Sequence, residues 1–533
     1  MKTYLQIKHD YLLFPVSQEA KGKRIMLLNE KGEIVLELHM LVDIIDPDCV
    51  VPYPVKQLKG KTFRIVTEPF MEFIPEQTDL VESALRRERY RPKIRFSPSY
   101  GWLNDPNGLV YANGVWHLFF QLQPFFKVPF DEAGFCSMHW GHATSNNLFH
   151  WIEQPIALYP DTLGAMFSGS AIVDFDNRLG LKQGNTETIV LFYTANGSVL
   201  KRSPSKKSVQ CMAYSTDNGK TFQKYAGNPL LEEIEPENRD PKVVYNEVTD
   251  SYVMIFYAGD QKKGNFLVYV SQNLKDWKRA EDIIVNGREC PDFFPMEYRE
   301  KEKWVFTTAN SNYVIGEFDG HHFTQETAEQ LLILGDQYAG QTWSNTGNRR
   351  IQMRVQFGGR IPGKYFNRAM SIPCELTLLE YENVPRLACQ PVKEIETLYE
   401  SCIIVHNPTG SYIKRLDAGA YDIQVELQCF NIGIITIALF GTKITIDFEE
   451  QTLCYGKKNE AKIQLKNGTI NHQIRIVYDT TLVMLFIDEG ISCMEYFDIL
   501  DENLSYFSIH MDKNVEIKKL KINKLRQTCW LSN

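Results

Sequence analysis

The segment Ser145-Asn146-Asn147-Leu148-Phe149-His150-Trp151 joins a serine, a polar turn and an aromatic ring, and this order decides the fold. Similar segments start at Ser215 and Ser271, at successive intervals of 70 and 56 residues, and a degenerate fourth copy covers 318–323. Compact propeller blades repeat every roughly 40 to 50 residues, so these intervals require extended loops between blades. Each copy is typical of the outer hairpin of a blade, although the same order occurs in hairpins of other all-β proteins. The repeat favours a β-propeller.

The size and composition are those of a soluble globular protein with more than one domain. The chain has 533 residues, with 44% hydrophobic and 23% charged residues. Because one hydrophobic core seldom supports such a length, we expect two or three domains. Aromatic residues reach 12%, which suits both strand packing and the stacking of sugar rings.

Strand-like segments dominate the chain, and helical periodicity is clearest at 77–89. Runs such as 115–120 and 188–193 are β-branched or aromatic, and turn residues bound them. From about Pro385 onward, alternating segments such as 421–427 predict a β-sandwich. We therefore divide this all-β chain into a small β-rich module with a linker at 1–88, a propeller at 89–384 and a sandwich at 385–533.

Charge and cysteine content limit the partners and the compartment. The net charge of −8 includes no basic block, which argues against nucleic acid and anionic membranes as partners. Residues 1–10 lack the apolar stretch of a secretory signal, and the longest apolar run, at 430–440, is too short to span a bilayer. The eleven cysteines are an odd number without a C-x-x-C pair. We expect a cytoplasmic protein; its oligomeric state stays open.

Asp105 is the first of three carboxylates with a chemically suggestive context. It lies in Trp102-Leu103-Asn104-Asp105-Pro106-Asn107-Gly108, which predicts a tight turn into the strand at 109–111. Such a turn presents a side chain from a stiff edge, as a nucleophile requires. On its own this is also an ordinary turn sequence.

Asp240 and Glu289 are the other two carboxylates with a chemically suggestive context. Arg239 precedes Asp240 and could keep it ionised while donating to a ligand hydroxyl; an exposed loop ion pair is the alternative. Glu289 enters the apolar segment Cys290-Pro291-Asp292-Phe293-Phe294, and burial there would raise its pKa, as a proton donor requires. Asp292 is the rival donor, with a capping or turn role as its alternative.

These carboxylates could cleave a glycosidic bond with retention. That reaction needs a carboxylate nucleophile and a carboxylic acid about 5 Å apart. Asp105 and Glu289 are 184 residues apart in the sequence, so only a closed architecture such as a propeller funnel would join them.

The histidines His139, His142 and His150 form the one histidine cluster of the sequence. No H-E-x-x-H motif accompanies them, so we expect packing and hydroxyl contacts and no metal. Nothing in the sequence calls for a cofactor.

Eight motifs, in order, resemble glycoside hydrolase family 32, which includes invertases, sucrose-6-phosphate hydrolases, inulinases and levanases. They span roughly residues 90 to 380. The motifs are Trp102 to Gly108, Phe119-Phe120-Gln121, His139-Trp140-Gly141-His142-Ala143, Phe167-Ser168-Gly169-Ser170-Ala171, Arg239-Asp240-Pro241, Glu289-Cys290-Pro291, Gln341-Thr342-Trp343 and Ser371-Ile372-Pro373.

The resemblance implies a five-bladed β-propeller followed by a β-sandwich, and a double-displacement mechanism. Asp105 would be the nucleophile, Glu289 the general acid and base, and Asp240 the stabiliser of the transition state. The substrate-binding residues would be Trp102, Asn104, Gln121, Trp140, Phe167, Ser168, Arg239, Cys290 and Trp343.

Three positions depart from the family pattern. Leu103 stands where Met is usual, a volume-conserving exchange. Gln123-Pro124 replaces the frequent Asn-Pro and could alter a pocket rim. Cys374 replaces a common Arg, which removes a charge.

The expected activity is exo-acting hydrolysis that releases terminal non-reducing β-D-fructofuranosyl residues from sucrose, fructo-oligosaccharides or fructans. Segments 91–98 and 165–171 are more similar to exo-inulinases and levanases than to plant invertases. A cytoplasmic location favours sucrose or short chains. The alternatives are a sucrose-6-phosphate hydrolase, a fructosyltransferase and a non-catalytic carbohydrate-binding protein.

Overall fold

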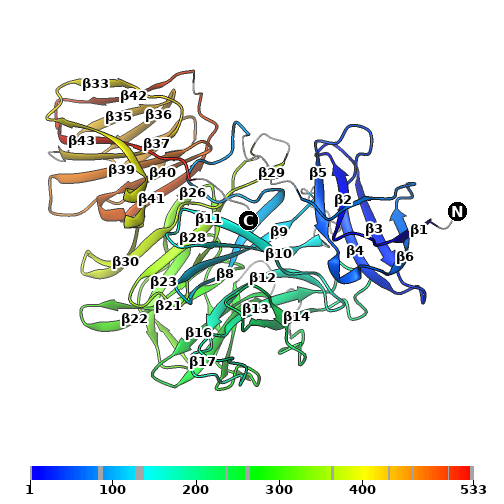
Figure 1. The fold of residues 1–533 in the computed structure, drawn as a ribbon. Coiled ribbons are helices and arrows are strands. Elements are labelled where there is room, and N and C mark those ends of the chain that lie inside the picture. Colours follow the sequence, from blue (N-terminus) through cyan, green and yellow to red (C-terminus); the bar gives the residue numbers. More distant parts are fainter. Residues whose placement is uncertain are drawn as a thin grey trace.

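The computed structural model describes residues 3–81, 88–125, 137–234, 238–258, 264–359, 361, 365–429, 432–458, 460–501 and 503–528. These residues form β-strands and short 3-10 helices, arranged as an N-terminal module, a propeller and a C-terminal sandwich (Figure 1). Within these residues no helix is long and apolar enough to cross a bilayer. The helix expected at 77–89 is wrong at its start, where strand β7 (Glu76–Thr78) pairs with β2; residues 82–87 lie outside the described residues.

The N-terminal module consists of two small sheets around their own core. In β2, every second residue is buried because alternate side chains of a strand face opposite sides. The first sheet has the order β1 (Thr3–Gln6), β6 (Thr62–Glu68), β3 (Gly22–Leu28), β4 (Ile34–Leu41), and the second β5 (Cys49–Pro54), β2 (Tyr11–Val16), β7; the 3-10 helix η1 (Lys56–Leu58) precedes β6.

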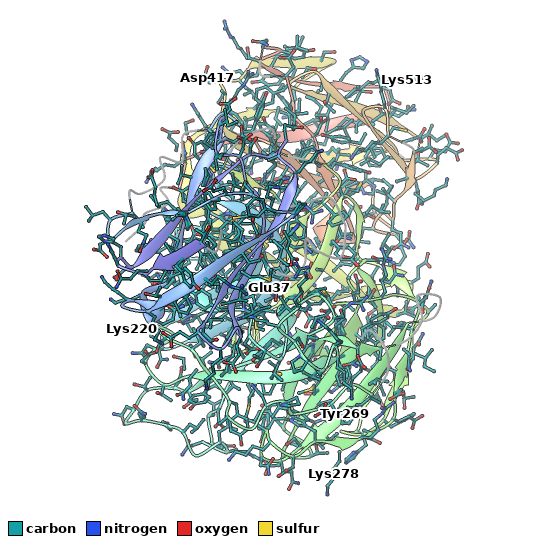
Figure 2. All side chains as sticks on the ribbon, turned by 90° about the vertical axis from the view of Figure 1, so that its right-hand side faces the viewer. Glu37, Lys220, Tyr269, Lys278, Asp417 and Lys513 are labelled. Atoms are coloured by element: carbon teal, nitrogen blue, oxygen red, sulfur yellow. The ribbon has the colours of Figure 1, made fainter. Side chains whose placement is uncertain are left out.

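This module is fixed to the propeller by buried contacts. Phe125, from the end of the second propeller strand, belongs to the core of the module. The Tyr53 hydroxyl lies 2.8 Å from His139 Nε2, and the buried Glu37 carboxylate accepts the backbone N–H groups of Lys201 and Arg202 at 2.9 and 3.0 Å (Figure 2). The module therefore braces the segments around the first two blades.

Gln123, which departs from the family pattern, lies in the same interface. Its Nε2 donates to the carbonyl of His39 at 3.0 Å, and its Oε1 accepts the N–H of Phe125 at 2.9 Å. This side chain therefore binds the N-terminal module. Leu103 is fully buried in the largest core, as a substitute for Met requires.

Five blades surround the propeller axis, which confirms the expected architecture. Blade 1 has β8 (Gly101–Ala112), β9 (Val115–Gln123), β10 (His139–Ser145) and β11 (Trp151–Leu158); blade 2 has β12 (Ala165–Val173), β13 (Ile189–Asn196), β14 (Ser208–Ser215) and β15 (Gln223–Lys224). Blade 3 has β16 (Arg239–Asn246), β17 (Ser251–Ala258), β18 (Asn265–Ser271), β19 (Lys278–Arg279) and β20 (Ile283–Ile284); blade 4 has β21 (Asp292–Tyr298), β22 (Lys301–Thr307), β23 (Asn312–Phe318), β24 (Phe323–Gln325) and β25 (Gln330–Leu331); blade 5 has β27 (Gln337–Thr342), β28 (Arg350–Gln356), β30 (Cys374–Tyr381) and β31 (Val384–Pro391).

The repeated segments lie where the sequence predicts, at the turns between the third and fourth strands of blades 1 to 4. The serine fixes the turn in three of them. Ser145, Ser215 and Ser271 each accept a backbone N–H of the turn through the hydroxyl, at 3.2, 2.9 and 2.9 Å. The repeat is therefore a genuine blade signal.

Blade 5 closes the ring on blade 1. Strand β29 (Phe366–Asn367) pairs parallel with Gly101 and Trp102 of β8, and the N–H of Ser344 donates to the carbonyl of Leu109 at 2.9 Å. Since β31 pairs along its whole length with β30, blade 5 runs to Pro391, beyond the boundary placed at residue 384.

The sandwich packs seven strands on six. The larger sheet has the order β26 (Ile333–Gly335), β41 (Ser492–Phe497), β40 (Leu482–Ile487), β39 (Asn471–Asp479), β34 (Ala420–Cys429), β43 (Val515–Leu525), β32 (Tyr399–His406). The smaller has the order β33 (Ser411–Arg415), β42 (Tyr506–Met511), β35 (Ile434–Leu439), β36 (Thr442–Asp447), β37 (Thr452–Tyr455), β38 (Ala461–Lys462); the 3-10 helices are η3 (Lys393–Leu398) and η4 (Asp488–Gly490).

Two buried ion pairs join the sandwich to the propeller. Arg95 Nε lies 3.2 Å from Asp479 Oδ2, and Arg354 Nε lies 3.4 Å from Glu495 Oε2. Arg354 Nη2 also lies 3.6 Å from Cys374 Sγ. The family commonly has an arginine at the position of Cys374. In this protein Arg354, on the neighbouring strand, supplies a positive charge at the same place.

Candidate active site

The innermost strands carry the predicted site residues at irregularities in their pairing. The register of β8 shifts between Leu103 and Pro106, that of β12 between Met166 and Gly169, and that of β16 between Arg239 and Lys242. A bulge leaves residues out of the ladder and re-aims their side chains.

Asp105 therefore sits inside a bulged strand, whereas the sequence predicted a turn. Its Oδ2 accepts the Ser168 hydroxyl at 2.6 Å, and Cys290 Sγ lies 3.5 Å from the same atom. Asp105 Oδ1 is buried and accepts no hydrogen bond from the described part of the chain. One oxygen is thus held in place and the other is left for a ligand.

Asp240 lies beside Asp105, with Cys290 between them. The Cys290 thiol is 3.5 Å from Asp240 Oδ2, and the N–H of Cys290 donates to that oxygen at 3.1 Å. Asp240 has φ of 65°, a conformation that its own N–H secures by donating to Thr194 Oγ1 at 3.0 Å. The site thus brings together two carboxylates and a thiol.

Glu289 stands nearer the solvent than the two aspartates. Its side chain is 25% exposed, against 8% for Asp105 and 6% for Asp240. Arg239 Nη2 donates to Glu289 Oε1 at 2.7 Å, and the Tyr338 hydroxyl donates to Glu289 Oε2. Glu289 is therefore the most accessible of the three carboxylates.

Two electrostatic predictions are wrong. Burial raises the pKa of Asp240 to about 7 and outweighs the opposing charge of Arg239, which lies 4.0 Å away and donates to Glu289. Burial alone would raise the pKa of Glu289, but Arg239 and the Tyr338 hydroxyl outweigh it and hold the pKa below its ordinary value. Burial also raises the pKa of Asp105, against the opposing effect of the Ser168 hydroxyl. The pKa shifts of the two aspartates and of Glu289 therefore run in opposite directions.

Sequence reasoning missed Tyr338 and Arg368. Tyr338 lies three residues before the Gln341-Thr342-Trp343 motif, and Arg368 lies three residues before Ser371-Ile372-Pro373. Proximity to these motifs was the only signal, because both side chains reach the site across blade 5.

Comparisons with known proteins agree with this geometry. The model of the glycosyl hydrolases family 32 N-terminal domain matches residues 95–391. The chain belongs to glycosyl hydrolase family 32. It is therefore a glycoside hydrolase of the β-fructosidase type.

The similarity extends over most of the chain. A levanase of Bacillus subtilis is 30% identical over 519 residues, which cover 85% of this chain and 74% of the levanase. An invertase of Schizosaccharomyces pombe is 35% identical over 434 residues, with 70% and 72% covered. The exo-inulinase structure from Aspergillus awamori superimposes with a TM-score of 0.73 at 23% identity, covering 83% of this chain and all of that one.

Most of the side chains predicted to bind substrate in this family 32 protein surround the three carboxylates. Ser168, Arg239 and Cys290 contact them directly. Gln121 donates to the carbonyl of Met166 at 2.8 Å. The aromatic side of the pocket comes from Trp102 and Phe167, which share a small cluster with Met138, Ala165 and Val199, and Asn104 accepts a hydrogen bond from Arg368.

Trp140 lies behind the pocket wall. It is fully buried, and its indole N–H donates to the carbonyl of Phe167 at 2.9 Å. Only glycine fits at position 108, because the Cβ of any other residue there would lie 2.9 Å from the Trp140 ring. Trp140 therefore shapes the strand that holds Asp105.

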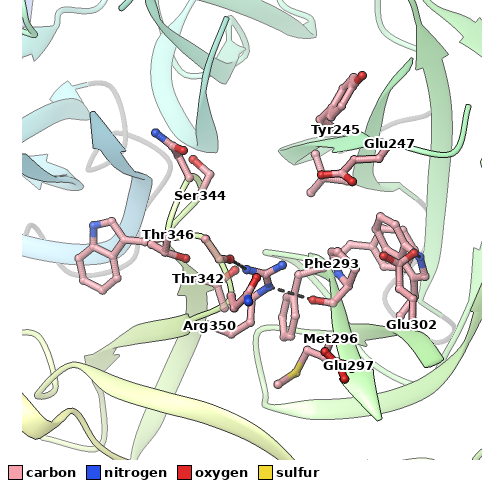
Figure 3. A pocket seen from close by; sticks show the side chains of 18 of the residues that line it. Tyr245, Glu247, Phe293, Met296, Glu297, Glu302, Thr342, Ser344, Thr346 and Arg350 are labelled. Carbon is pink, nitrogen blue, oxygen red and sulfur yellow. Dashed lines mark hydrogen bonds between the residues drawn. The ribbon is translucent and has the colours of Figure 1, made fainter. Parts of the chain in front are cut away.

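Trp343 is a correction, because it lines the opposite end of the propeller channel. A cavity of about 1050 Å³ opens there (Figure 3), and its walls include Tyr245, Glu297, Glu302, Trp343, Thr346 and Arg350. Trp343 donates to the carbonyl of His117 at 2.9 Å and stacks on Trp151 at 6.2 Å. Gln341, two residues before Trp343, still donates to the carbonyl of Cys290 at 3.3 Å, so Trp343 lies just beyond the carboxylates along β27, where it lines the cavity.

A buried ion pair stands between this cavity and the site. Lys242 Nζ lies 2.7 Å from Asp292 Oδ1, with 5% and 0% of the side chains exposed. Asp292 also accepts the N–H of Thr342 at 2.7 Å. Asp292, the rival proton donor, is thus engaged in holding three inner strands together.

The three histidines do not converge. His139 contacts Tyr53, His142 Nε2 lies 3.0 Å from His117 Nδ1, and His150 contacts Asn147. Burial lowers the pKa of His139 to about 3 and that of His117 to about 4, so both are neutral. Among the described residues, no group of histidine, cysteine and acidic side chains is arranged to hold a metal ion.

Proposed function

We propose that this family 32 hydrolase releases terminal non-reducing β-D-fructofuranosyl residues from sucrose and short fructo-oligosaccharides with retention of configuration. The observation that carries the proposal is the convergence of Asp105 and Asp240 on the Cys290 thiol, with Glu289 one residue away in the chain. Two carboxyl groups of different exposure on one pocket provide a nucleophile and a proton donor.

Each carboxylate has a defined task in the mechanism. Asp105 attacks the anomeric carbon through its unpaired oxygen, while Ser168 holds the other one. Glu289 gives a proton to the departing oxygen and then takes one from the water that releases fructose. Asp240, held by Thr194 and Cys290, faces the fructosyl unit from the pocket floor.

Glu289 must hold a proton before it can act as the acid. Arg239 and the Tyr338 hydroxyl both bind its carboxylate and hold its pKa below the ordinary value. A bound sugar whose hydroxyls engage Arg239 weakens one of these contacts and so raises the pKa of Glu289.

A substrate panel tests the proposal. Sucrose, sucrose 6-phosphate, 1-kestose, inulin and levan are incubated with the protein, and free fructose and oligosaccharide products are measured. We expect fructose from sucrose and 1-kestose. Oligosaccharides with little free fructose would identify a fructosyltransferase, preference for the phosphorylated sugar a sucrose-6-phosphate hydrolase, and no cleavage at any pH a binding protein.

Asp105→Asn provides the matched variant. Loss of the nucleophile should lower kcat by a factor of about 10⁴ or more. Binding of sucrose, measured by calorimetry, should persist because the pocket keeps its shape.

The proposal also places the protein in the cytoplasm. The nine cysteines of the described residues form no disulfide with one another, and seven of them are buried, which suits a reducing compartment. Cell fractionation followed by immunodetection tests this; recovery in the secreted fraction would contradict it.

A further inference from the structure

Arg368 is a buried cation beside the nucleophile that the reaction described above does not use. The residue is 9% exposed, and its backbone has φ of 68°, a conformation that costs a non-glycine residue about 1 kcal/mol or more. A side chain kept at such a position is a candidate for a role in the pocket.

The surroundings of the guanidinium are aromatic. It lies 4.9 Å from the ring of Trp102 and 4.2 Å from that of Phe357. No carboxylate of the described residues pairs with it at ion-pair distance. Buried cations are normally paired, so this charge is available to a ligand.

One donor of Arg368 orients the site. Its Nη1 donates to Asn104 Oδ1. Because a guanidinium cannot accept a hydrogen bond, the oxygen of Asn104 must face Arg368 and the NH2 group must face away from it. The four remaining N–H bonds have no partner among the described residues, and their nitrogens are not sealed from solvent.

Arg368 stands on the side of the pocket at which the leaving group departs. Phe357, which packs on Arg368, lies 5.2 Å from the Tyr338 ring, and Tyr338 binds Glu289. Arg368, Phe357 and Tyr338 thus form a continuous wall from Asn104 to the proton donor. The side of Glu289 is where the departing oxygen must lie.

We propose that Arg368 binds the sugar that leaves, through charged hydrogen bonds to its hydroxyls or to a phosphate on it, while Phe357 contacts its apolar face. Arg368 is therefore a specificity-determining residue for the leaving group. The inference rests on the proposed fructosidase function.

The charge state of Arg368 agrees with a role in binding the leaving group. Burial lowers the pKa of Arg368 to about 10, although the carboxylate of Asp105 opposes the shift. The guanidinium therefore stays charged at neutral pH.

The test compares substrates that share the fructosyl unit and differ in the leaving group. Arg368→Met and Arg368→Lys are assayed with sucrose, sucrose 6-phosphate and methyl β-D-fructofuranoside, and kcat/KM is determined for each. Arg368→Met should lower kcat/KM for sucrose about 10- to 100-fold more than for the methyl fructoside, because the methyl fructoside loses only the orientation of Asn104 while sucrose also loses a charged hydrogen bond. Arg368→Lys should recover part of the loss because it restores the charge.

The outcomes separate the hypotheses. A larger loss for sucrose 6-phosphate than for sucrose identifies phosphate as the group bound, and equal losses identify hydroxyls. Equal losses for sucrose and the methyl fructoside would show that Arg368 acts only through Asn104, and the proposal would be overturned. A wild-type protein inactive on all fructosides would refute the proposed function itself.

A control variant removes an arginine outside the site. Arg299 is 60% exposed and pairs with Glu380. Arg299→Met should leave all three kcat/KM values unchanged.

Discussion

Arg239 donates to Glu289 across 2.7 Å, although its neighbour in sequence is Asp240. Because Arg239 binds Glu289, the two carboxyl groups have pKa shifts of opposite direction. Arg239 and Tyr338 hold the pKa of Glu289 below its ordinary value, while burial raises the pKa of Asp240 to about 7.

Tyr338→Phe should move the pH profile of kcat/KM. The Tyr338 hydroxyl stabilises ionised Glu289, so its removal raises the pKa of that carboxyl. A carboxyl with a higher pKa stays protonated to higher pH, and the alkaline limb should shift upward by roughly one pH unit. Tyr245→Phe is the control, since that hydroxyl binds Asp250 at the far cavity. A downward shift for Tyr338→Phe would contradict the assigned hydrogen bond.

Asp240→Asn should stabilise the fold at alkaline pH while it impairs activity. The folded pKa is about 7, against 3.8 for the unfolded group. The folded state is therefore penalised as pH rises from about 4 to 7, and the penalty reaches about 4 kcal/mol above pH 7. Thermal unfolding at pH 4 and pH 8 measures this. The variant should gain stability at pH 8 and little at pH 4; equal effects at both would contradict the burial argument.

Asp292→Asn should weaken the fold more than the chemistry. The substitution leaves Lys242 buried without its carboxylate, which costs about 3–5 kcal/mol. We expect a lower unfolding temperature with kcat changed only a few-fold. The double variant with Lys242→Met should regain part of the stability. If kcat fell about 10³-fold or more in a well-folded Asp292→Asn protein, Asp292 would have to be the proton donor.

Phe125→Ala should loosen the N-terminal module and lower activity. The Phe125 ring lies 5.4 Å from the rings of both Phe14 and Tyr53, so its loss should cost about 3–5 kcal/mol. Phe73→Ala is the matched control, because Phe73 belongs to the same core but to the module itself. At equal loss of stability, Phe125→Ala should reduce kcat/KM more. Equal activities would show that the module does not brace the site.

The sequence predicted features that are local in the chain. The hairpin serines and the segment around Asp105 are recognisable within a few residues, so the propeller and the three carboxylates could be anticipated. The bulge at Asp105 could not, because a bulge depends on the pairing partner β9.

What the sequence failed to predict depends on contacts between distant segments. Arg239 had two possible carboxylate partners, and only the assembled blades place Glu289 nearer. Trp343 belongs to a recognisable motif, yet strand direction places it at the other end of the channel. Arg368 gave no signal beyond its place near a motif, because its importance depends on rings 266 and 11 residues away in sequence, those of Trp102 and Phe357.

The position of Phe125 in the core of the N-terminal module has a consequence for biosynthesis. The module precedes the propeller in the chain and is therefore translated before it, but its core stays incomplete until the second strand of blade 1 has followed. Tyr53 must likewise wait for His139. We therefore expect the module and the first blade to fold together, as one cooperative unit.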